Sequence, residues 1–251
     1  MWELIKSGGP LMVPLIICAI LSIAYIIERL WVLSRVPRPE EAQRQLEEVE
    51  EILARQGEEA AAARCAKGKG VLNYIFAALM KRYDRLMIEQ REFEDTRDII
   101  VQLARAGGAG DLAEFTMTER ELSNLKDELV YEVDEASRAY LGKNLNILST
   151  IGQISPLLGL LGTITGMIIA FRAIAIAGTG DPKVVASGIS QALVTTAAGL
   201  TIALPTIVAH RYLAAKADSL RRQLEVYGYA FSNSLIIAGL KRKEREIVTN
   251  E

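Results

Sequence analysis

The sequence has little of the material from which enzyme sites are built. It holds one histidine, His210, and two cysteines, Cys18 and Cys65, which lie far apart. A His-based zinc site or a Ser/His/Asp triad therefore has almost no residues to use, and two distant cysteines specify no disulfide framework. The sequence also holds no recognisable phosphate-binding loop. We predict that the protein is not an enzyme and needs no cofactor or metal.

Charge is missing from three long stretches. No Asp, Glu, Lys or Arg occurs in residues 7–27, 145–171 or 184–210, and about 20 apolar residues suffice to cross a bilayer. We predict an all-α integral membrane protein with transmembrane helices at residues 11–33, 144–177 and 184–210. A signal peptide is the competing interpretation of the first stretch. The length of that stretch, its weakly basic leader and the lack of a small-x-small cleavage site favour a retained helix.

The remaining residues are rich in charge and in turn signals. Residues 34–143 are predicted to form a helical domain and residues 211–251 a helical tail that continues the third span. Apolar spacing together with Pro and Gly signals predicts helices within residues 37–57, 58–70, 71–93 and 94–105, and one continuous helix from about 118 to 176. A GGAG sequence at 107–110 separates the last two. Such a long helix would extend the second span far into the cytoplasm.

Basic residues near the ends of the spans predict the orientation. The turn at 178–183 holds only Lys183, with Arg172 near it. The opposite side collects Arg29, Arg35, Arg38, Arg138, Lys143, Arg211, Lys216, Arg221 and Arg222. Cytoplasmic loops carry the excess of Lys and Arg. The lead-in at 1–10 and the turn at 178–183 are therefore predicted to be periplasmic, and residues 34–143 and 211–251 cytoplasmic.

Small residues and prolines are frequent in the second and third spans. Gly162 and Gly166 form a G-x-x-x-G pair, which lets two helices approach closely. We therefore interpret the following glycines as packing positions: Gly159, Gly162, Gly166 and Gly199. Pro156 and Pro205 disturb helical hydrogen bonding, so each predicts a bend or a packing contact.

Four polar residues lie within the same spans, namely Thr163, Gln191, Thr195 and Thr196. Gln191 and Thr195 share one helix face, and Thr196 lies on the next. This pattern suits either tight packing or a narrow wet passage, and spacing alone does not decide between them. No ionisable residue stands deep in any span, whereas a proton path normally needs a titratable relay. Proton movement would therefore require a carboxylate from another chain.

Two segments carry a family resemblance. GLLGTITGMIIAFRAIA at 159–175 and DPKVVASGISQALVTTAAGLTIALPTIVAHRYLA at 181–214 resemble the MotA/TolQ/ExbB proton-channel family, in particular its ExbB/TolQ branch. The resemblance implies a homopentamer in the bacterial inner membrane, in contact with lipid. Its second and third helices would line a pore around the helices of a single-span ExbD/TolR-like partner that carries a proton-binding Asp. Proton entry would then do work on a TonB/TolA-like protein, for energised outer-membrane transport or envelope maintenance.

The resemblance also assigns residues. Thr163 and Thr196 match the two pore threonines of the family, with Thr195 as an additional neighbour. Gln191 departs from the family pattern, which has Glu at this position. Either this pore needs no carboxylate of its own, or its ion chemistry differs. In the first case this subunit does not relay protons itself. Two rivals stay open, namely a flagellar-stator-like MotA subunit, although such proteins have four spans, and a non-conducting membrane scaffold. Nothing points to nucleic acid as a partner.

Overall fold

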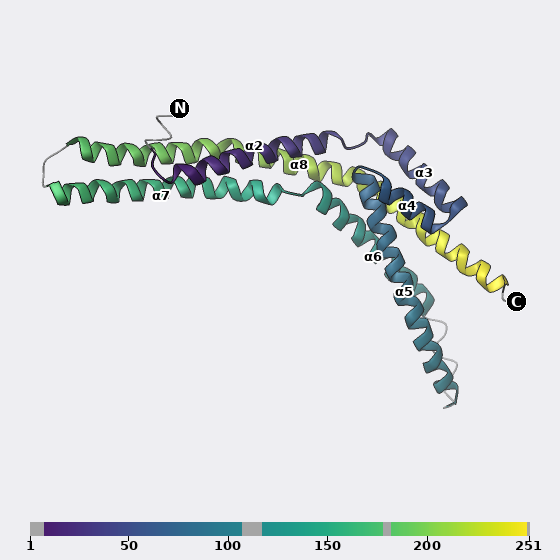
Figure 1. Ribbon diagram of the computed structural model, residues 1–251. Helices are drawn as coiled ribbons and strands as arrows, with labels where there is room; N and C mark the ends of the chain where they lie inside the picture. The colour runs from purple at the N-terminus through teal and green to yellow at the C-terminus, as the bar shows by residue number, and fades with distance from the viewer. Residues whose placement is uncertain (1–7, 107–116, 178–181, 250–251) are drawn as a thin grey trace. The chain divides into compact units, whose positions relative to one another are not determined.

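The structure is a computed structural model that describes residues 8–106, 117–177 and 182–249 (Figure 1). Its regular elements are all helices within these residues: α2 (Met12–Ser34), α3 (Pro39–Gln56), α4 (Glu58–Lys67), α5 (Val71–Ala106), α6 (Met117–Leu141), α7 (Leu145–Ala177) and α8 (Pro182–Thr249). The chain divides into two compact units. The first, here the membrane unit, comprises residues 1–34 and 142–217, and the second, the polar unit, comprises 35–141 and 218–251.

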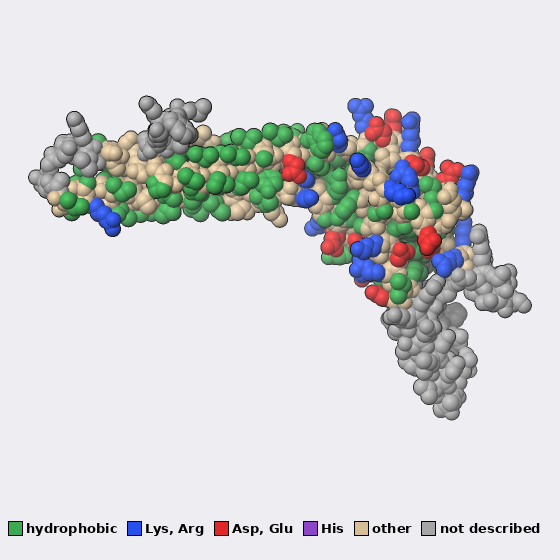
Figure 2. Space-filling model, viewed as in Figure 1, with side chains coloured by type: hydrophobic (Ala, Val, Ile, Leu, Met, Phe, Trp, Pro, Cys, Tyr) green, Lys and Arg blue, Asp and Glu red, His purple; other side chains and the backbone are tan. Residues whose placement is uncertain are grey.

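The helices of the membrane unit are long and apolar. Candidate spans lie at Met12–Ser34, Leu145–Ile176 and Val185–Arg242, and only 17–28% of the most apolar window in each is buried within the chain. Figure 2 shows hydrophobic side chains covering much of this unit. Apolar side chains are stable in such exposed positions when lipid or another protein surrounds them. The predicted fold class, an all-helical membrane protein with three spanning helices, is confirmed.

Two short helices of the polar unit begin and end where the sequence signals predict. Pro39 occupies the start of α3, and Glu41 Oε2 accepts a hydrogen bond from the Arg38 N–H at 3.4 Å. At the other end, Gly57 has φ +87° and its N–H donates to Leu53 O at 3.2 Å. Only glycine adopts this backbone conformation without strain, so α3 stops there and α4 begins one residue later.

The core of the polar unit lies along α5. Six apolar residues near the start of this helix are all buried: Leu72, Ile75, Phe76, Leu79, Met80 and Tyr83. The Phe76 ring meets the Phe231 ring of α8 at a centroid distance of 4.6 Å. This aromatic pair adds a directional contact to the burial of apolar surface.

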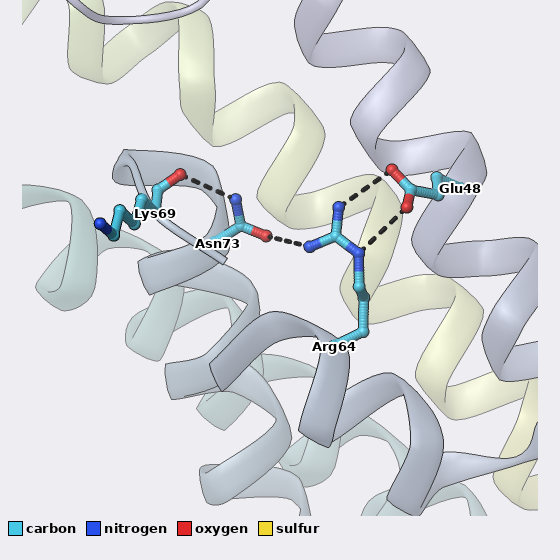
Figure 3. A network of polar contacts seen from close by, with 4 residues as sticks. All are labelled: Glu48, Arg64, Lys69 and Asn73. Carbon is cyan, nitrogen blue, oxygen red and sulfur yellow. Dashed lines mark hydrogen bonds and ion pairs between the residues drawn. The ribbon is translucent and has the colours of Figure 1, made fainter. Parts of the chain in front are cut away.

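A polar network joins the first three helices of the polar unit (Figure 3). The Arg64 guanidinium of α4 donates to both carboxylate oxygens of Glu48 on α3, at 3.0 and 3.1 Å. A third nitrogen donates to Asn73 Oδ1 at 3.4 Å, and Asn73 Nδ2 donates to Lys69 O at 3.0 Å. The two-pronged pairing fixes the guanidinium plane and so aligns α3, α4 and the start of α5.

Two helix predictions need correction. The segment 94–105 is part of α5 rather than a separate helix. The continuous helix predicted from about 118 to 176 is wrong, because residues 142–144 interrupt it. Asn144 has φ +62° and its Nδ2 donates to both Glu28 carboxylate oxygens at 3.2 Å. The left-handed residue ends the helical hydrogen-bond ladder, and the side chain ties the break to α2. The predicted features at 107–110 and 178–181 lie outside the described residues.

Candidate functional site: the polar contacts of the membrane helices

The contact between α7 and α8 is built on glycines. A Cβ atom at Gly166 would lie 2.7 Å from Gly188 O and 2.9 Å from Ala192 Cβ, and one at Gly199 would lie 2.5 Å from Ser155 O. These distances leave no room for a side chain. The two backbones therefore approach each other directly, as small residues allow in membrane helices.

The threonines lie at the same contact. Thr196 Oγ1 on α8 donates to Gly159 O on α7 at 3.0 Å, which joins the two helices. Thr195 Oγ1 bonds to the carbonyls of Gln191 at 3.1 Å and Ala192 at 2.9 Å, and its hydroxyl lies in the space left by Gly162. The contact thus brings together Thr195 and Thr196 with all four glycines that the sequence singled out.

The remaining predicted polar residues differ in exposure. Thr163 is half-buried, and its Oγ1 donates to Leu160 O in its own helix at 2.7 Å. Gln191 and Thr196 are also half-buried, whereas Thr195 is only 1% exposed. Within one chain, Thr163, Thr196 and Gln191 keep surface that another chain can reach. Thr195 is enclosed between its own helices.

The two prolines lie inside helices that continue past them. Pro156 and Pro205 have no N–H, so each removes one backbone hydrogen bond from α7 or α8. Hydroxyls bond to carbonyls beside both breaks, since Ser155 Oγ donates to Ile151 O at 2.7 Å and Thr206 Oγ1 to Ile202 O at 2.6 Å. Such bonding to the i−4 carbonyl is typical of Ser and Thr in membrane helices.

A buried hydroxyl pair that the sequence analysis did not identify joins α2 to α8. Ser22 Oγ and Thr206 Oγ1 are 2.6 Å apart, and both residues are buried. Because the Thr206 proton is directed to its own helix, Ser22 supplies the proton of this bond. Single hydroxyls in apolar runs give little signal, so the pairing could be recognised only from the folded helices.

Carboxylates are scarce in this unit. The described part of α7 holds none, and α8 holds none before Asp218. Glu28, near the end of α2, bonds to Asn144 and forms an ion pair with Arg29 at 3.2 Å. Among the described residues, no group of three or more His, Cys, Asp or Glu is placed to hold a metal ion. The site offers hydroxyls, an amide and closely approached backbones.

These features define an all-helical integral membrane protein whose second and third spans form a tightly packed, hydroxyl-bearing pair. Residues 96–226, just over half of the chain, match the MotA/TolQ/ExbB proton channel family. The chain belongs to this family.

Individual relatives agree with this assignment. The biopolymer transport protein ExbB of Helicobacter pylori is 36% identical over 134 residues, which cover 53% of this chain and 92% of that protein. The exbB1 protein of Vibrio cholerae is 34% identical over 161 residues, 63% of this chain and 67% of the relative. The Tol-Pal system protein TolQ of Pseudomonas aeruginosa is 30% identical over 128 residues, 48% of this chain and 54% of the relative.

Proposed function

We propose that the chain is the ExbB/TolQ-like subunit of a motor driven by the proton motive force in the bacterial inner membrane. Five copies enclose the transmembrane helices of an ExbD/TolR-like partner, and proton entry is coupled to work on a TonB/TolA-like protein. The observation that carries the proposal is the α7–α8 pair, which holds hydroxyls at its glycine contact and has no carboxylate in α7 or in α8 before Asp218. Membership of a proton channel family supports it.

The partner supplies the titrating group in this proposal. Thr163, Thr196 and Gln191 are polar but cannot change charge across the physiological range, whereas a proton relay needs a titratable residue. One charge crossing 100 mV releases about 2.3 kcal/mol. Steps of that size suffice to bias a helix pair between near-equivalent positions within a ring of five subunits, and are too small to separate a tightly packed interface.

The orientation remains as the basic residues predict it. The lead-in at 1–10 and the turn at 178–183 lie in the periplasm, and residues 34–143 and 211–251 lie in the cytoplasm. The concentration of basic residues beside the spans supports this arrangement. Accessibility of single introduced cysteines to a membrane-impermeant reagent in intact cells tests it.

Proton flux into liposomes tests the function. The chain is reconstituted with a single-span partner that carries an Asp, and a pH-sensitive dye inside the vesicles reports flux under a membrane potential. We expect flux with wild type and reduced flux with Thr163→Ala and Thr196→Ala. Thr201→Ala is the matched control, because Thr201 is an exposed threonine of α8 that bonds to Ala197 O of its own helix at 2.7 Å, and the family resemblance assigns it no place in the pore. Absence of flux from the wild-type complex would contradict the proposal.

A non-conducting scaffold is the second candidate. It is favoured by the hydroxyls of Thr163, Thr195 and Thr196, which all bond to protein carbonyls. Threonines that serve only helix packing would make the same hydrogen bonds. No flux from the wild-type complex, together with silent Thr163→Ala and Thr196→Ala variants in cells, would decide for the scaffold.

A further inference from the structure

The Gln191 side chain lies against the turn that precedes α2. A Cβ atom at Gly9 would overlap the Gln191 amide nitrogen and would also lie 2.8 Å from its Cδ. Gly9 has φ +69°, and its carbonyl accepts the first bond of α2, from Met12 N at 3.1 Å. The amide thus occupies the volume that a side chain at residue 9 would fill.

The neighbouring glycine extends the same contact. Gly8 is buried, and a Cβ atom there would lie 3.4 Å from Thr195 Cγ2. Thr195 in turn fills the space beside Gly162 on α7. A continuous layer therefore runs from the start of α2, through one turn of α8, to α7. The polar residues at 191 and 195 form its centre.

We propose that Gln191 is a positioning residue, which holds the Gly8–Gly9 turn and thereby the N-terminal end of α2 on α8. The role of this contact in the motor rests on the proposed function, whereas the contact itself does not depend on that function. The side chain at this position makes a contact within its own chain. Gly9 is the residue that makes room for it.

Cross-linking tests the contact directly. The two native cysteines, Cys18 and Cys65, are first replaced by Ser, and the pair Gly9→Cys and Gln191→Cys is introduced into the full chain. Mild oxidation is expected to join the pair within one chain, seen as faster migration on a non-reducing gel. The control pairs Gly9→Cys with Leu193→Cys, because Leu193 is 64% exposed. A dimer band, or no cross-link for the first pair, would overturn the proposal.

A double-mutant comparison tests the positioning role. Gly9→Ala is expected to lower the thermal unfolding midpoint of the purified complex, and Gln191→Ala in that background to restore the part of the loss that exceeds the backbone penalty. Gly57→Ala is the matched control, since Gly57 also has a positive φ, +87°, and a Cβ atom added there would meet no other atom within 4 Å. The control measures the penalty of the backbone conformation alone, which should lower the midpoint by about 2–4 °C. Gly9→Ala should lower the midpoint about twice as far, because it also carries the clash with Gln191. Equal shifts would overturn the proposal.

Proton flux separates positioning from direct contact with the partner. If Gln191 acts through the turn, Gly9→Ala and Gln191→Ala each reduce flux, and the double variant is no worse than the poorer single one. Multiplied losses would show two independent roles and contradict the inference. If wild type conducts nothing, the proposed function fails, while the cross-link and the midpoints still decide whether Gln191 holds the turn.

Discussion

The two units of the chain hold their helices together by different means. In the membrane unit, Gly166 and Gly199 bring backbone against backbone, and Thr196 bonds across to Gly159 O at 3.0 Å. In the polar unit, the Phe76–Phe231 ring pair lies in an apolar core. Around it stand ion pairs such as Arg82–Glu128 at 2.6 Å and Arg221–Asp134 at 3.0 Å, and charged side chains cover much of its surface (Figure 2).

The difference follows from the two solvents. In water, burying apolar side chains is the main favourable term, so large residues occupy the core. In lipid, an exposed leucine costs nothing, and helices associate through close packing and hydrogen bonds instead. Leu157, Leu193 and Leu204 of the membrane unit are accordingly 63–64% exposed. Removing a large buried side chain should therefore destabilise the polar unit, whereas adding a methyl group at a glycine contact should destabilise the membrane unit.

The largest effect is expected from Phe76→Ala. Phe76 is fully buried, and removing its ring leaves a cavity against Phe231, which costs about 3–5 kcal/mol. Hydrogen–deuterium exchange of the intact chain should rise across α5. The control is Ile88→Ala, because Ile88 is 58% exposed. Unchanged exchange in Phe76→Ala would mean that the polar unit is not held by this core.

An added methyl group should disturb the membrane unit. Gly199→Ala would bring a Cβ to 2.5 Å from Ser155 O, a backbone atom that cannot move alone. We expect a loss of about 1–3 kcal/mol, measured as a lower thermal midpoint in detergent. Gly152→Ala is the control, because the three atoms nearest to its Cβ would all belong to side chains, with Ile207 Cγ1 at 2.8 Å and Thr206 Cγ2 at 3.7 Å. Equal losses would argue against the backbone contact.

A smaller effect is expected at the ion pairs. Asp134 accepts from Arg221 at 3.0 Å and from Arg138 at 2.9 Å, so Asp134→Asn should destabilise the polar unit by up to about 1 kcal/mol. The loss should shrink in high salt because exposed charges are screened. Glu51→Gln removes the exposed Glu51–Arg55 pair and serves as control. A loss that does not depend on salt would rule out the electrostatic explanation.

The smallest effect concerns Cys65, which belongs to the polar unit. Burial is the main cause that raises the pKa of its thiol, to about 11 from 9.0, so little reactive thiolate exists at pH 8. The shift lowers the thiolate fraction about 100-fold. In a Cys18→Ser variant, iodoacetamide should label the folded chain slowly and the denatured chain rapidly. Because the folded pKa is raised, this group stabilises the fold below pH 9 and the contribution is lost above it. Fast labelling of folded protein would show that the thiol is accessible.

Much of the fold could be predicted because segments in contact with lipid lack charged residues, whereas segments in contact with water are rich in them. The uncharged runs identified the three spans, and Pro39, Gly57 and the apolar face of α5 identified helices of the polar unit. The break at 142–144 was missed although Gly142 and Asn144 are ordinary helix-ending residues. Apolar residues recur at helical spacing on both sides of these residues, so the pattern predicts one helix across the ending signal.

The candidate site was only partly predictable. The sequence located the glycines and polar residues, since small residues in an apolar run are conspicuous. It left open whether they pack or line a passage, because that depends on what each side chain meets. The contacts of Gln191 with Gly9 and of Ser22 with Thr206 join residues about 180 positions apart. No local pattern in the sequence carries information on such pairs.

The glycine contacts also restrict how the membrane unit can change shape. Gly166 opposite Gly188, and Gly199 opposite Ser155, fit only in one register. Sliding either helix by one residue would drive a Cβ atom into a backbone carbonyl. The α7–α8 pair should therefore behave as one rigid unit. Movement during a working cycle should occur between the outer faces of this pair and other chains, not between α7 and α8.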